Sequence, residues 1–232
     1  MPNENTIYLA DSKNAPYGLR PKKEIVALSC KNTELLLEMG CKIIVVACNT
    51  ATTNAIKELR AKYDVPFIGI EPAIKPAANN STTQTIGILA TKGTLSSELF
   101  NKAVEIYQNT TIIEQVGHGL VELIESGQIE SEEMDALLLQ YLNPMIDANI
   151  DYLVLGCSHY PYLIPKIRKI LPDGIHIIDS GEAVARQTQN VLREKVGLAE
   201  QNESKTTFYT NSDAAVLANI IGNHYKVEQK DF

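Results

Sequence analysis

The chain has 232 residues, of which 44% are hydrophobic and 21% charged, as is ordinary for a globular protein of one large or two small domains. Its net charge of −7 argues against a nucleic-acid partner, because no basic stripe is present to neutralise phosphates. No apolar run approaches the ~20 residues that span a bilayer, and the start of the chain lacks the features of a signal peptide. We therefore expect a cytoplasmic protein with no membrane partner.

Short β-branched runs alternate with longer amphipathic stretches along the chain. This alternation predicts the α/β class, with parallel sheets covered by helices on both faces. The expected strands are, in chain order, residues 43–47, 67–70, 85–89, 111–115, 152–155, 175–178 and 206–209.

Helical patterns fill the intervals between these strands. Residues 134–145 repeat apolar side chains at the spacing of a one-sided helix, and Ser131 before them is a predicted N-cap. A final helix is expected to open at residues 211–213. Its predicted buried face consists of Val216, Leu217, Ile220 and Ile221.

Two segments of the chain resemble each other. Residues 43–50 read IIVVACNT and residues 152–159 read YLVLGCSH. In each, an apolar strand ends in a small residue, a cysteine and two short polar or hydrogen-bonding residues, and a helix-compatible stretch follows. Pro161 suits the first turn of the second helix. The repeat predicts two related α/β halves, each with one thiol at the same structural position.

This position favours chemistry at Cys48 and Cys157. The carboxyl ends of parallel strands are where open α/β sheets place their sites. A helix N-terminus beside each cysteine is expected to lower the pKa of its thiol, and the free N–H groups there can hold a carboxylate. Asn49, Thr50 and Ser158 add hydrogen-bonding side chains suited to the same ligand.

Two facing thiols match the inversion of an amino acid at its α-carbon. One group removes a proton from one face and the other delivers a proton to the opposite face, so no cofactor is needed. Cys48 and Cys157 are therefore predicted to face each other across a cleft between the two halves. In each direction one must be thiolate and the other thiol, and their roles reverse with the hand of the substrate.

Packing is the competing interpretation for every cysteine, because free cysteine is among the most buried residue types. Cys30 and Cys41 lie in or beside the predicted helix over 24–40, and we interpret both as structural. The repeated context favours function for the other two. His159 is either a hydrogen-bonded structural residue or a polarising group near Cys157. A metal at this pair is not expected, since a second pair of ligands with zinc-like spacing is missing.

Several motifs resemble those of bacterial glutamate racemases. Residues 46–51 (VACNTA) and 155–161 (LGCSHYP) resemble the two signatures of that family, which are specific. Residues 15–18 (APYG) resemble its substrate-contacting loop, 90–94 (ATKGT) its threonine-bearing turn, and 178–183 (IDSGEA) its later crossover. The similarity runs from about Ile7 to Asp213. Related aspartate racemases share the two-cysteine logic but carry different residues around each cysteine.

The resemblance implies roles for individual residues. Cys48 and Cys157 would be the catalytic acid–bases, with His159 beside the second. Glu125 would assist the second cysteine, although the sequence alone reads it as a solvated helix residue. Thr91 and Thr94 could equally be turn and cap residues. The substrate contacts implied are Tyr17, Gly18, Asn49, Thr50, Ser158 and His159, with Thr91 and Thr94 ranked below them.

The implied fold has two pseudo-symmetric α/β domains with the active site in the cleft between them. The first domain would comprise residues 1–72 and 180–232, and the second residues 73–179. The implied activity is interconversion of L- and D-glutamate, without cofactor or metal, which supplies peptidoglycan synthesis. The alternatives are a truncated, inactive relative that only binds, and a related aspartate or hydantoin racemase.

The chain departs from the family pattern in three places. Ser158 stands where most members have threonine, and Gly117-His118 where many have Cys-Pro. More seriously, the family opens with a strand that ends in Asp-Ser-Gly, and neither residues 11–13 nor residues 179–181 replace it. Loss of an inner strand exposes backbone groups on its neighbours. We therefore expect low activity, and either marginal stability or a homodimer formed through the exposed edge.

Overall fold

The structure is a computed structural model that describes residues 3–200, 204–222 and 225–232. All strands predicted from the sequence are present, with ends that shift by at most one residue, and two further strands flank them. The strands are Thr6–Ala10 (β1), Ile44–Val46 (β2), Phe67–Gly69 (β3), Thr85–Ala90 (β4), Thr111–Val116 (β5), Tyr152–Gly156 (β6), His176–Ile178 (β7), Thr206–Thr210 (β8) and Val227–Gln229 (β9).

Helices alternate with these strands, and short 3-10 turns and one π turn complete the connections. The α-helices are Lys22–Glu38 (α1), Asn49–Lys62 (α2), Ile74–Asn80 (α3), Lys92–Leu95 (α4), Glu98–Glu105 (α5), Leu120–Glu125 (α6), Glu132–Asp147 (α7), Ile164–Ile170 (α8), Gly181–Val191 (α9) and Ala214–Ile221 (α10). The short turns are Ser12–Asn14 (η1), Tyr17–Leu19 (η2), Tyr160–Leu163 (η3) and Leu192–Val196 (η4).

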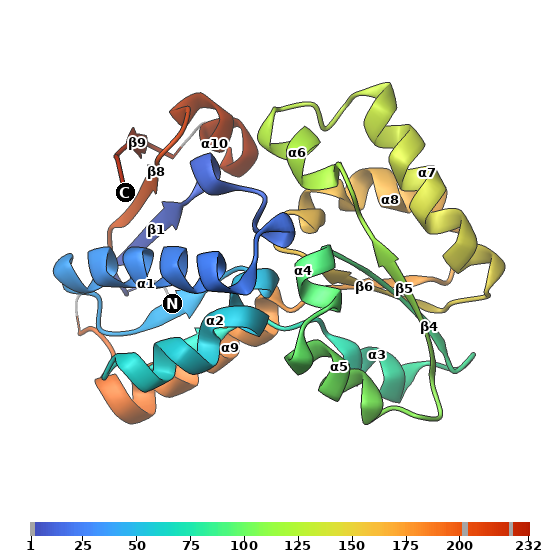
Figure 1. Cartoon of the computed structure of the whole chain (residues 1–232), viewed down its shortest axis with the longest axis horizontal. Coiled ribbons are helices and arrows are strands. Elements are labelled where there is room, and N and C mark those ends of the chain that lie inside the picture. The colour runs from blue at the N-terminus through green and yellow to red at the C-terminus, as the bar shows by residue number, and fades with distance from the viewer. Residues whose placement is uncertain (1–2, 201–203, 223–224) are drawn as a thin grey trace.

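The elements form two halves that lie side by side (Figure 1). We call the part around β1–β3, β8 and β9 the first half, and the part around β4–β7 the second half. The chain enters the second half after β3 and returns before α9. These two connecting segments are joined by a hydrogen bond that the Ser180 hydroxyl donates to the Glu71 carbonyl. The boundaries expected after residues 72 and 179 stay a prediction.

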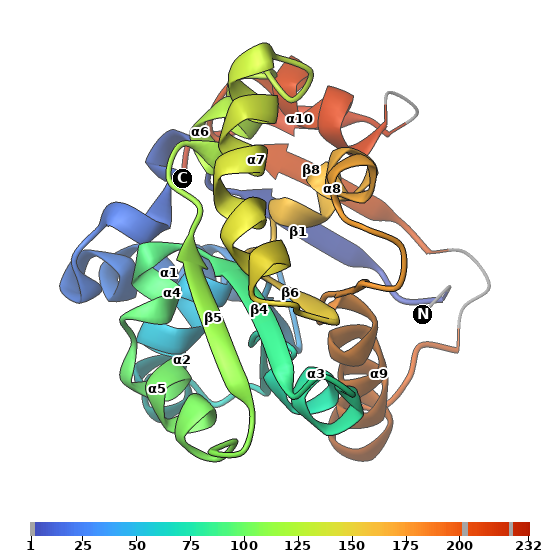
Figure 2. The ribbon, with the colours of Figure 1, turned by 90° about the vertical axis from the view of Figure 1, so that its right-hand side faces the viewer.

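The second half is built on a parallel four-stranded sheet in the order β5-β4-β6-β7. Helices α6, α7 and α8 pack on one face, where Leu89, Leu153 and Leu155 point into the largest buried cluster. Helices α3 and α5 cover the other face, where Ile88 and Val154 are buried (Figure 2). Burial on both faces explains the continuous apolar runs of β4 and β6.

The first half has the same kind of strands but not one continuous sheet. Among the described residues, β1 pairs with β8, which pairs with β9, whereas β2 pairs only with β3. Helices α1 and α2 pack together over β2, where Ile25, Ile44 and Leu59 form the centre of a small core. No ladder joins β1 to β2 within the part of the chain described, so the sheet of this half is divided.

Helix caps follow the sequence predictions, but one predicted face does not. The Ser131 side chain accepts from the Met134 amide at the start of α7, and Asp213 caps α10 in the same way. On α10 only Leu217 is fully buried, whereas the rest of the predicted face is half-buried. The correction has a physical reason. Helix α10 lies at the margin of the divided sheet. The sheet beneath it is therefore too small to cover the whole apolar face of the helix.

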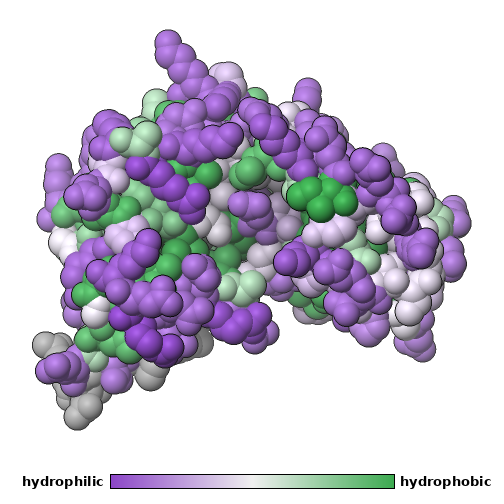
Figure 3. All heavy atoms as spheres, turned by 90° about the horizontal axis from the view of Figure 1, so that it is seen from below, coloured by the Kyte–Doolittle hydropathy of each residue, from purple (hydrophilic) through white to green (hydrophobic). Residues whose placement is uncertain are grey.

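The face of the molecule seen from below is mainly polar (Figure 3). Hydrophilic residues cover most of the face seen from below, and apolar residues appear there in small groups (Figure 3). Within the described residues, no helix combines the length and the apolar character needed to cross a membrane.

Candidate active site

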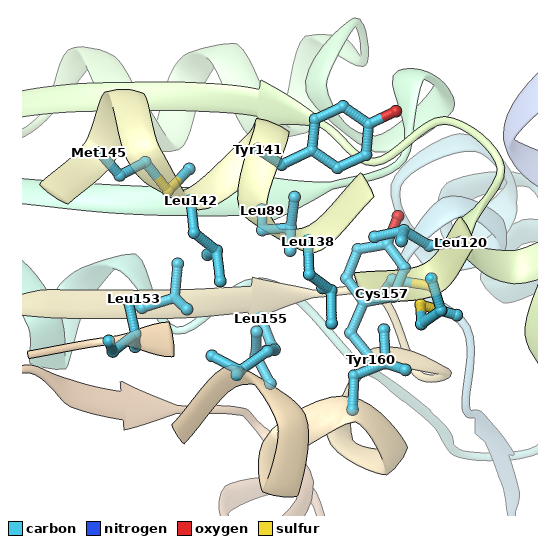
Figure 4. Close-up of a cluster of buried hydrophobic side chains, with 14 of the residues drawn as sticks. Leu89, Leu120, Leu138, Tyr141, Leu142, Met145, Leu153, Leu155, Cys157 and Tyr160 are labelled. Atoms are coloured by element: carbon cyan, nitrogen blue, oxygen red, sulfur yellow. The ribbon is translucent and has the colours of Figure 1, made fainter. Parts of the chain in front are cut away.

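The two repeated cysteines occupy equivalent places in the fold. Cys48 follows β2 and is the N-cap of α2, with its sulfur 3.5 Å from the Ala51 amide that donates to it. Cys157 follows β6 and precedes η3. The side chain of Cys157 is 7% exposed and packs beside Leu120 and Tyr160 at the end of β6 (Figure 4). Both cysteines are free thiols, and both line one cleft between the halves.

The cleft gathers most of the site residues expected from the sequence. The first half supplies the loop around η2 and the start of α2, and the second half supplies the residues after β4 and β6 and the end of α6. The expected residues that line the cleft are Tyr17, Gly18, Cys48, Thr50, Thr91, Glu125, Cys157, Ser158 and His159.

Two expected substrate contacts lie behind the wall of the cleft. Asn49 is 2% exposed, and its Nδ2 has no hydrogen-bond partner among the described residues. Thr94 is fully buried and does not line the cleft. Such an unpaired buried group costs about 1–3 kcal/mol.

The pKa of the Cys48 thiol is opposite to the sequence expectation. Burial raises its pKa to about 11, and the nearby Cys157 adds to the rise. The amides of Ala51 and Thr50 at the start of α2 lower the pKa, as expected for a helix N-terminus, but burial outweighs them. Cys48 is therefore a thiol at neutral pH, ready to donate a proton rather than to remove one.

A hydrogen-bonded chain leads from α6 to the second cysteine. Glu125 Oε1 lies 2.7 Å from His159 Nε2, and His159 Nδ1 lies 3.9 Å from Cys157 Sγ. Burial disfavours charge on the imidazole, but its bonds with Cys157 and Glu125 outweigh burial and raise the pKa of His159 to about 10. A protonated His159 can stabilise negative charge that develops in the cleft. Glu125 is thus not a solvated helix residue.

Three threonine hydroxyls join the halves beside the cleft. Thr50 Oγ1 lies 2.7 Å from that of Thr91 and 3.3 Å from that of Thr94, and the latter two are 3.1 Å apart. Thr91 also caps α4 by accepting from the Thr94 amide, as the alternative interpretation expected. A side chain at Gly18 would meet Thr91 Cβ at 2.7 Å, so glycine is what allows this close approach.

Sequence reasoning missed an aspartate that holds the loop of Tyr17. Tyr17 donates from its hydroxyl to Asp11 Oδ2 at 2.5 Å, and Asp11 Oδ1 accepts from the side-chain amides of Asn14 at 2.7 Å and Asn211 at 2.5 Å. Burial and the Asp11 carboxylate raise the pKa of Tyr17 well above its usual value. The available signal was the place of Asp11, directly after a strand at the same sheet edge as the cysteines.

Comparison with known proteins places this geometry in a family. The family model for Asp/Glu/hydantoin racemases matches residues 1–188. A glutamate racemase of Herpetosiphon aurantiacus is 41% identical, over 95% of this chain and 87% of that protein. Among solved structures, glutamate racemase isoform RacE1 of Bacillus anthracis is 28% identical with a TM-score of 0.87, covering 100% of this chain and 88% of that one.

A second solved structure has the same degree of similarity. It is the Escherichia coli glutamate racemase in complex with L-glutamate and the activator UDP-MurNAc-Ala, 28% identical with a TM-score of 0.87, covering 99% of this chain and 90% of that one. The family model, the sequence relatives and the solved structures agree with one another. The chain therefore belongs to the glutamate racemases, within the Asp/Glu/hydantoin racemase family.

Proposed function

We propose that the chain interconverts L- and D-glutamate by proton transfer through Cys48 and Cys157. The observation that carries the proposal is the placement of two free thiols, one after an equivalent strand in each half, in the wall of one cleft. One sulfur, as thiolate, takes the proton from the α-carbon, and the other, as thiol, gives a proton to the opposite face. The bonds formed and broken balance without any oxidant or reductant.

The starting state follows from the charges in the cleft. Cys48 begins as the proton donor, because burial raises the pKa of its thiol to about 11. The role of base then falls to Cys157, whose sulfur lies 3.9 Å from Nδ1 of the His159 that Glu125 holds. When the substrate has the other hand, the transfer runs in reverse and the two cysteines exchange roles.

Glutamate must be bound by local contacts in the cleft and not by long-range electrostatic attraction, since the net charge of −7 would repel a dicarboxylate. We assign the α-carboxylate to the amides at the start of α2 and the hydroxyls of Thr50 and Ser158. Glutamate is favoured over aspartate and hydantoins because the relatives at about 40% identity carry the name glutamate racemase, and the Escherichia coli relative was solved with L-glutamate. The expected supply of D-glutamate to peptidoglycan, and the cytoplasmic location, rest on the same likeness.

The direct test is to incubate the purified chain with each enantiomer of glutamate and of aspartate, and with a substituted hydantoin, and to separate the products by chiral chromatography. We expect glutamate alone to be racemised, with uptake of solvent deuterium at the α-carbon. Racemisation of aspartate or the hydantoin in its place would assign the chain to a different substrate. Binding of glutamate without turnover would support the alternative of an inactive binding relative.

Replacement of the thiols tests the two-base assignment. Cys48→Ala and Cys157→Ala should each abolish racemisation, because each removes the only acid–base group on one face. Cys41→Ala is the matched control, since Cys41 does not line the cleft, and it should keep full activity. Two-way racemisation by the Cys157→Ala protein would contradict the mechanism. Single serine replacements should leave deuterium exchange strongly biased towards one enantiomer.

A further inference from the structure

A second cavity lies between the two halves. The first half contributes parts of η2, α1 and α2 to its lining, and the second half contributes parts of α4 and α5. These elements contact one another, and Figure 1 shows α4 and α5 beside α2. We call this space, which has a volume of about 630 Å³, the α2–α5 cavity. Small-molecule sites typically have volumes of about 300–1,000 Å³, so the cavity is large enough for an organic ligand.

Only a thin wall separates this cavity from the catalytic cleft. Gly18 lines both spaces, whereas Gly93 lines the cavity alone. A side chain at Gly93 would meet the Thr50 methyl group at 2.8 Å and the Gly18 carbonyl at 3.1 Å. Asn54 joins the halves at the same place, since its Nδ2 donates to the Thr50 carbonyl at 2.9 Å and to the Gly93 carbonyl at 3.0 Å. A molecule in the cavity would therefore contact both halves directly behind residue 18.

The lining of the cavity is positively charged, in contrast to the chain as a whole. Four cations line it against two carboxylates, whereas the whole chain has a net charge of −7. The cations are Arg20, Lys22, Lys57 and Lys92, and the carboxylates are Glu58 and Glu98. An excess of two positive charges in a concave space attracts anions.

Both carboxylates of the lining already have cationic partners. The ion pairs at the cavity are Arg20–Glu24, Lys22–Glu58 and Lys102–Glu98. Lys102 does not itself line the cavity, so Glu98 uses no cation of the lining. Two of the four cations are therefore left without a counter-charge.

These two cations are Lys57 of α2 and Lys92 of α4, which belong to opposite halves. Within the part of the chain that the structure describes, neither lysine forms an ion pair. Lys102 lowers the pKa of the Glu98 carboxyl most, and Lys57 adds to this from the first half. The charge of Lys57 thus acts across the cavity on a group of the second half.

Part of the cavity wall is apolar. Ile25 and Ile56 line it and are almost fully buried, and Leu19 lines it with 62% of its surface exposed. A bare inorganic ion held by the lysines would leave this surface in contact with water. An anion with an organic body would cover it, which is favourable.

We propose that the α2–α5 cavity binds a small organic anion with at least two negative charges. Lys57 and Lys92 would each donate a charge-assisted hydrogen bond to it, one from each half. Its organic body would cover Ile25 and Ile56. Phosphate and carboxylate groups offer the same chemistry to an ammonium group, so one probe of each kind is needed. Gly18 is the only residue of the lining that also lines the cleft, so binding can be measured independently of racemisation.

Methyl NMR of the whole chain locates and measures the binding. The probes are phenyl phosphate and phthalate, with benzyl alcohol as the uncharged match. We expect the charged probes to shift the methyl signals of Ile25, Ile56 and Leu99 saturably, and to bind at least about tenfold more tightly than benzyl alcohol. Binding of one charged probe alone would identify the ligand as a phosphate or a carboxylate. The signals of Leu9 and Leu36, which line only the cleft, report binding at the wrong place.

Two variants remove the proposed contacts. Lys57→Gln and Lys92→Gln should each weaken binding of the charged probes by about tenfold, because each change removes one charge and keeps most of the side-chain length. Both lysines are exposed, so neither change disturbs the core. Lys31→Gln is the matched control, since Lys31 is exposed on α1 and does not line the cavity, and it should keep the affinity of the wild type.

Three results would overturn the proposal. They are signals of Ile25, Ile56 and Leu99 that no charged probe shifts, shifts confined to Leu9 and Leu36, and an affinity for the charged probes that Lys57→Gln and Lys92→Gln leave unchanged. The second result would place the probes in the catalytic cleft, and the third would show that the two lysines do not hold the anion.

Discussion

At the scale of single residues, the ionisation of the site side chains depends on how deeply they are buried, which no local sequence pattern indicates. Glu125 has the sequence context of a solvated helix residue, yet its side chain is 21% exposed and meets His159, which is 34 positions away. The pKa of Cys48 moved opposite to the helix-terminus argument for the same reason, because burial outweighed the backbone amides. The residue types of the site could be predicted from the sequence, but their ionisation could not, since it depends on the tertiary contacts.

Glu125→Gln tests the link between α6 and the second cysteine. The change removes the anionic partner of His159, so the pKa of His159 should fall from about 10 towards its ordinary 6.5. Glu122→Gln is the matched control, because Glu122 lies on the same helix and is exposed. NMR titration of the imidazole measures both variants. An unchanged His159 pKa in Glu125→Gln would contradict the role given to this pair.

The same pair makes a prediction for stability. A histidine whose pKa is raised on folding stabilises the fold fully below its unfolded pKa of about 6.5, and this contribution is lost as pH rises through about 10. Urea denaturation of the wild type and of Glu125→Gln should therefore differ most near pH 6 and converge by about pH 10. A difference that is constant over this range would assign the effect of Glu125 to packing alone.

At the scale of elements, the strands were predictable where β-branched runs are bounded by polar residues, and their ends agree to within one residue. Strand β1 was not among them, although β8, its ladder partner 200 positions away, was. The predicted face of α10 lies inward but is only partly buried, for a reason that the sequence does not contain. Periodicity gives the direction of a helix face, but the surface that it meets is a property of the assembled sheet.

A substitution of Thr52 tests how α2, which begins after Cys48, is attached to the ends of β2 and β3. Its buried hydroxyl donates to the Val46 carbonyl and accepts from the Ile70 amide, both at 3.0 Å, and so joins the ends of β2 and β3. Thr52→Val keeps the shape but leaves both groups unpaired, which should lower the free energy of unfolding by about 1–3 kcal/mol. Urea denaturation measures this change. Thr53→Val, half-buried on the same helix, should cost much less, and equal losses would contradict the bridging role.

At the scale of the whole molecule, the repeat around the cysteines predicted two related halves, and the structure contains them. The repeat did not reveal that the described strands of the first half form two separate sheets. A parallel sheet gains its rigidity from strands paired on both edges. Among the described residues, β4 and β6 of the second half and β8 of the first half are paired in this way, whereas β2 pairs only with β3. Among the described residues, Cys48 follows a strand paired on one edge and Cys157 follows a strand paired on both. We therefore expect the strands that precede the two proposed acid–bases to differ in stability.

This inequality predicts that the first half opens more readily than the second. Ile44 and Leu153 are a matched pair, since they occupy the same position of the repeat, four residues before Cys48 and Cys157, and both are buried. Among the described strands, that of Ile44 is paired with β3 only, through the Pro66 carbonyl, whereas that of Leu153 is paired on both sides. Opening at β2 breaks the hydrogen bonds of one strand edge, whereas opening at β6 breaks those of two. Opening at β2 should therefore cost less free energy by about 1–3 kcal/mol.

Native-state hydrogen exchange in low urea measures the difference directly. A gap of 1.4 kcal/mol corresponds to about tenfold in an equilibrium constant, so the Ile44 amide should exchange roughly 5 to 150 times faster than that of Leu153, after correction for intrinsic rates. The urea dependence should also be shallower at Ile44, because opening of the first half alone exposes less surface than global unfolding. Equal rates with equal urea slopes would contradict the prediction, since they would mean that the two halves unfold as one cooperative unit despite the divided sheet.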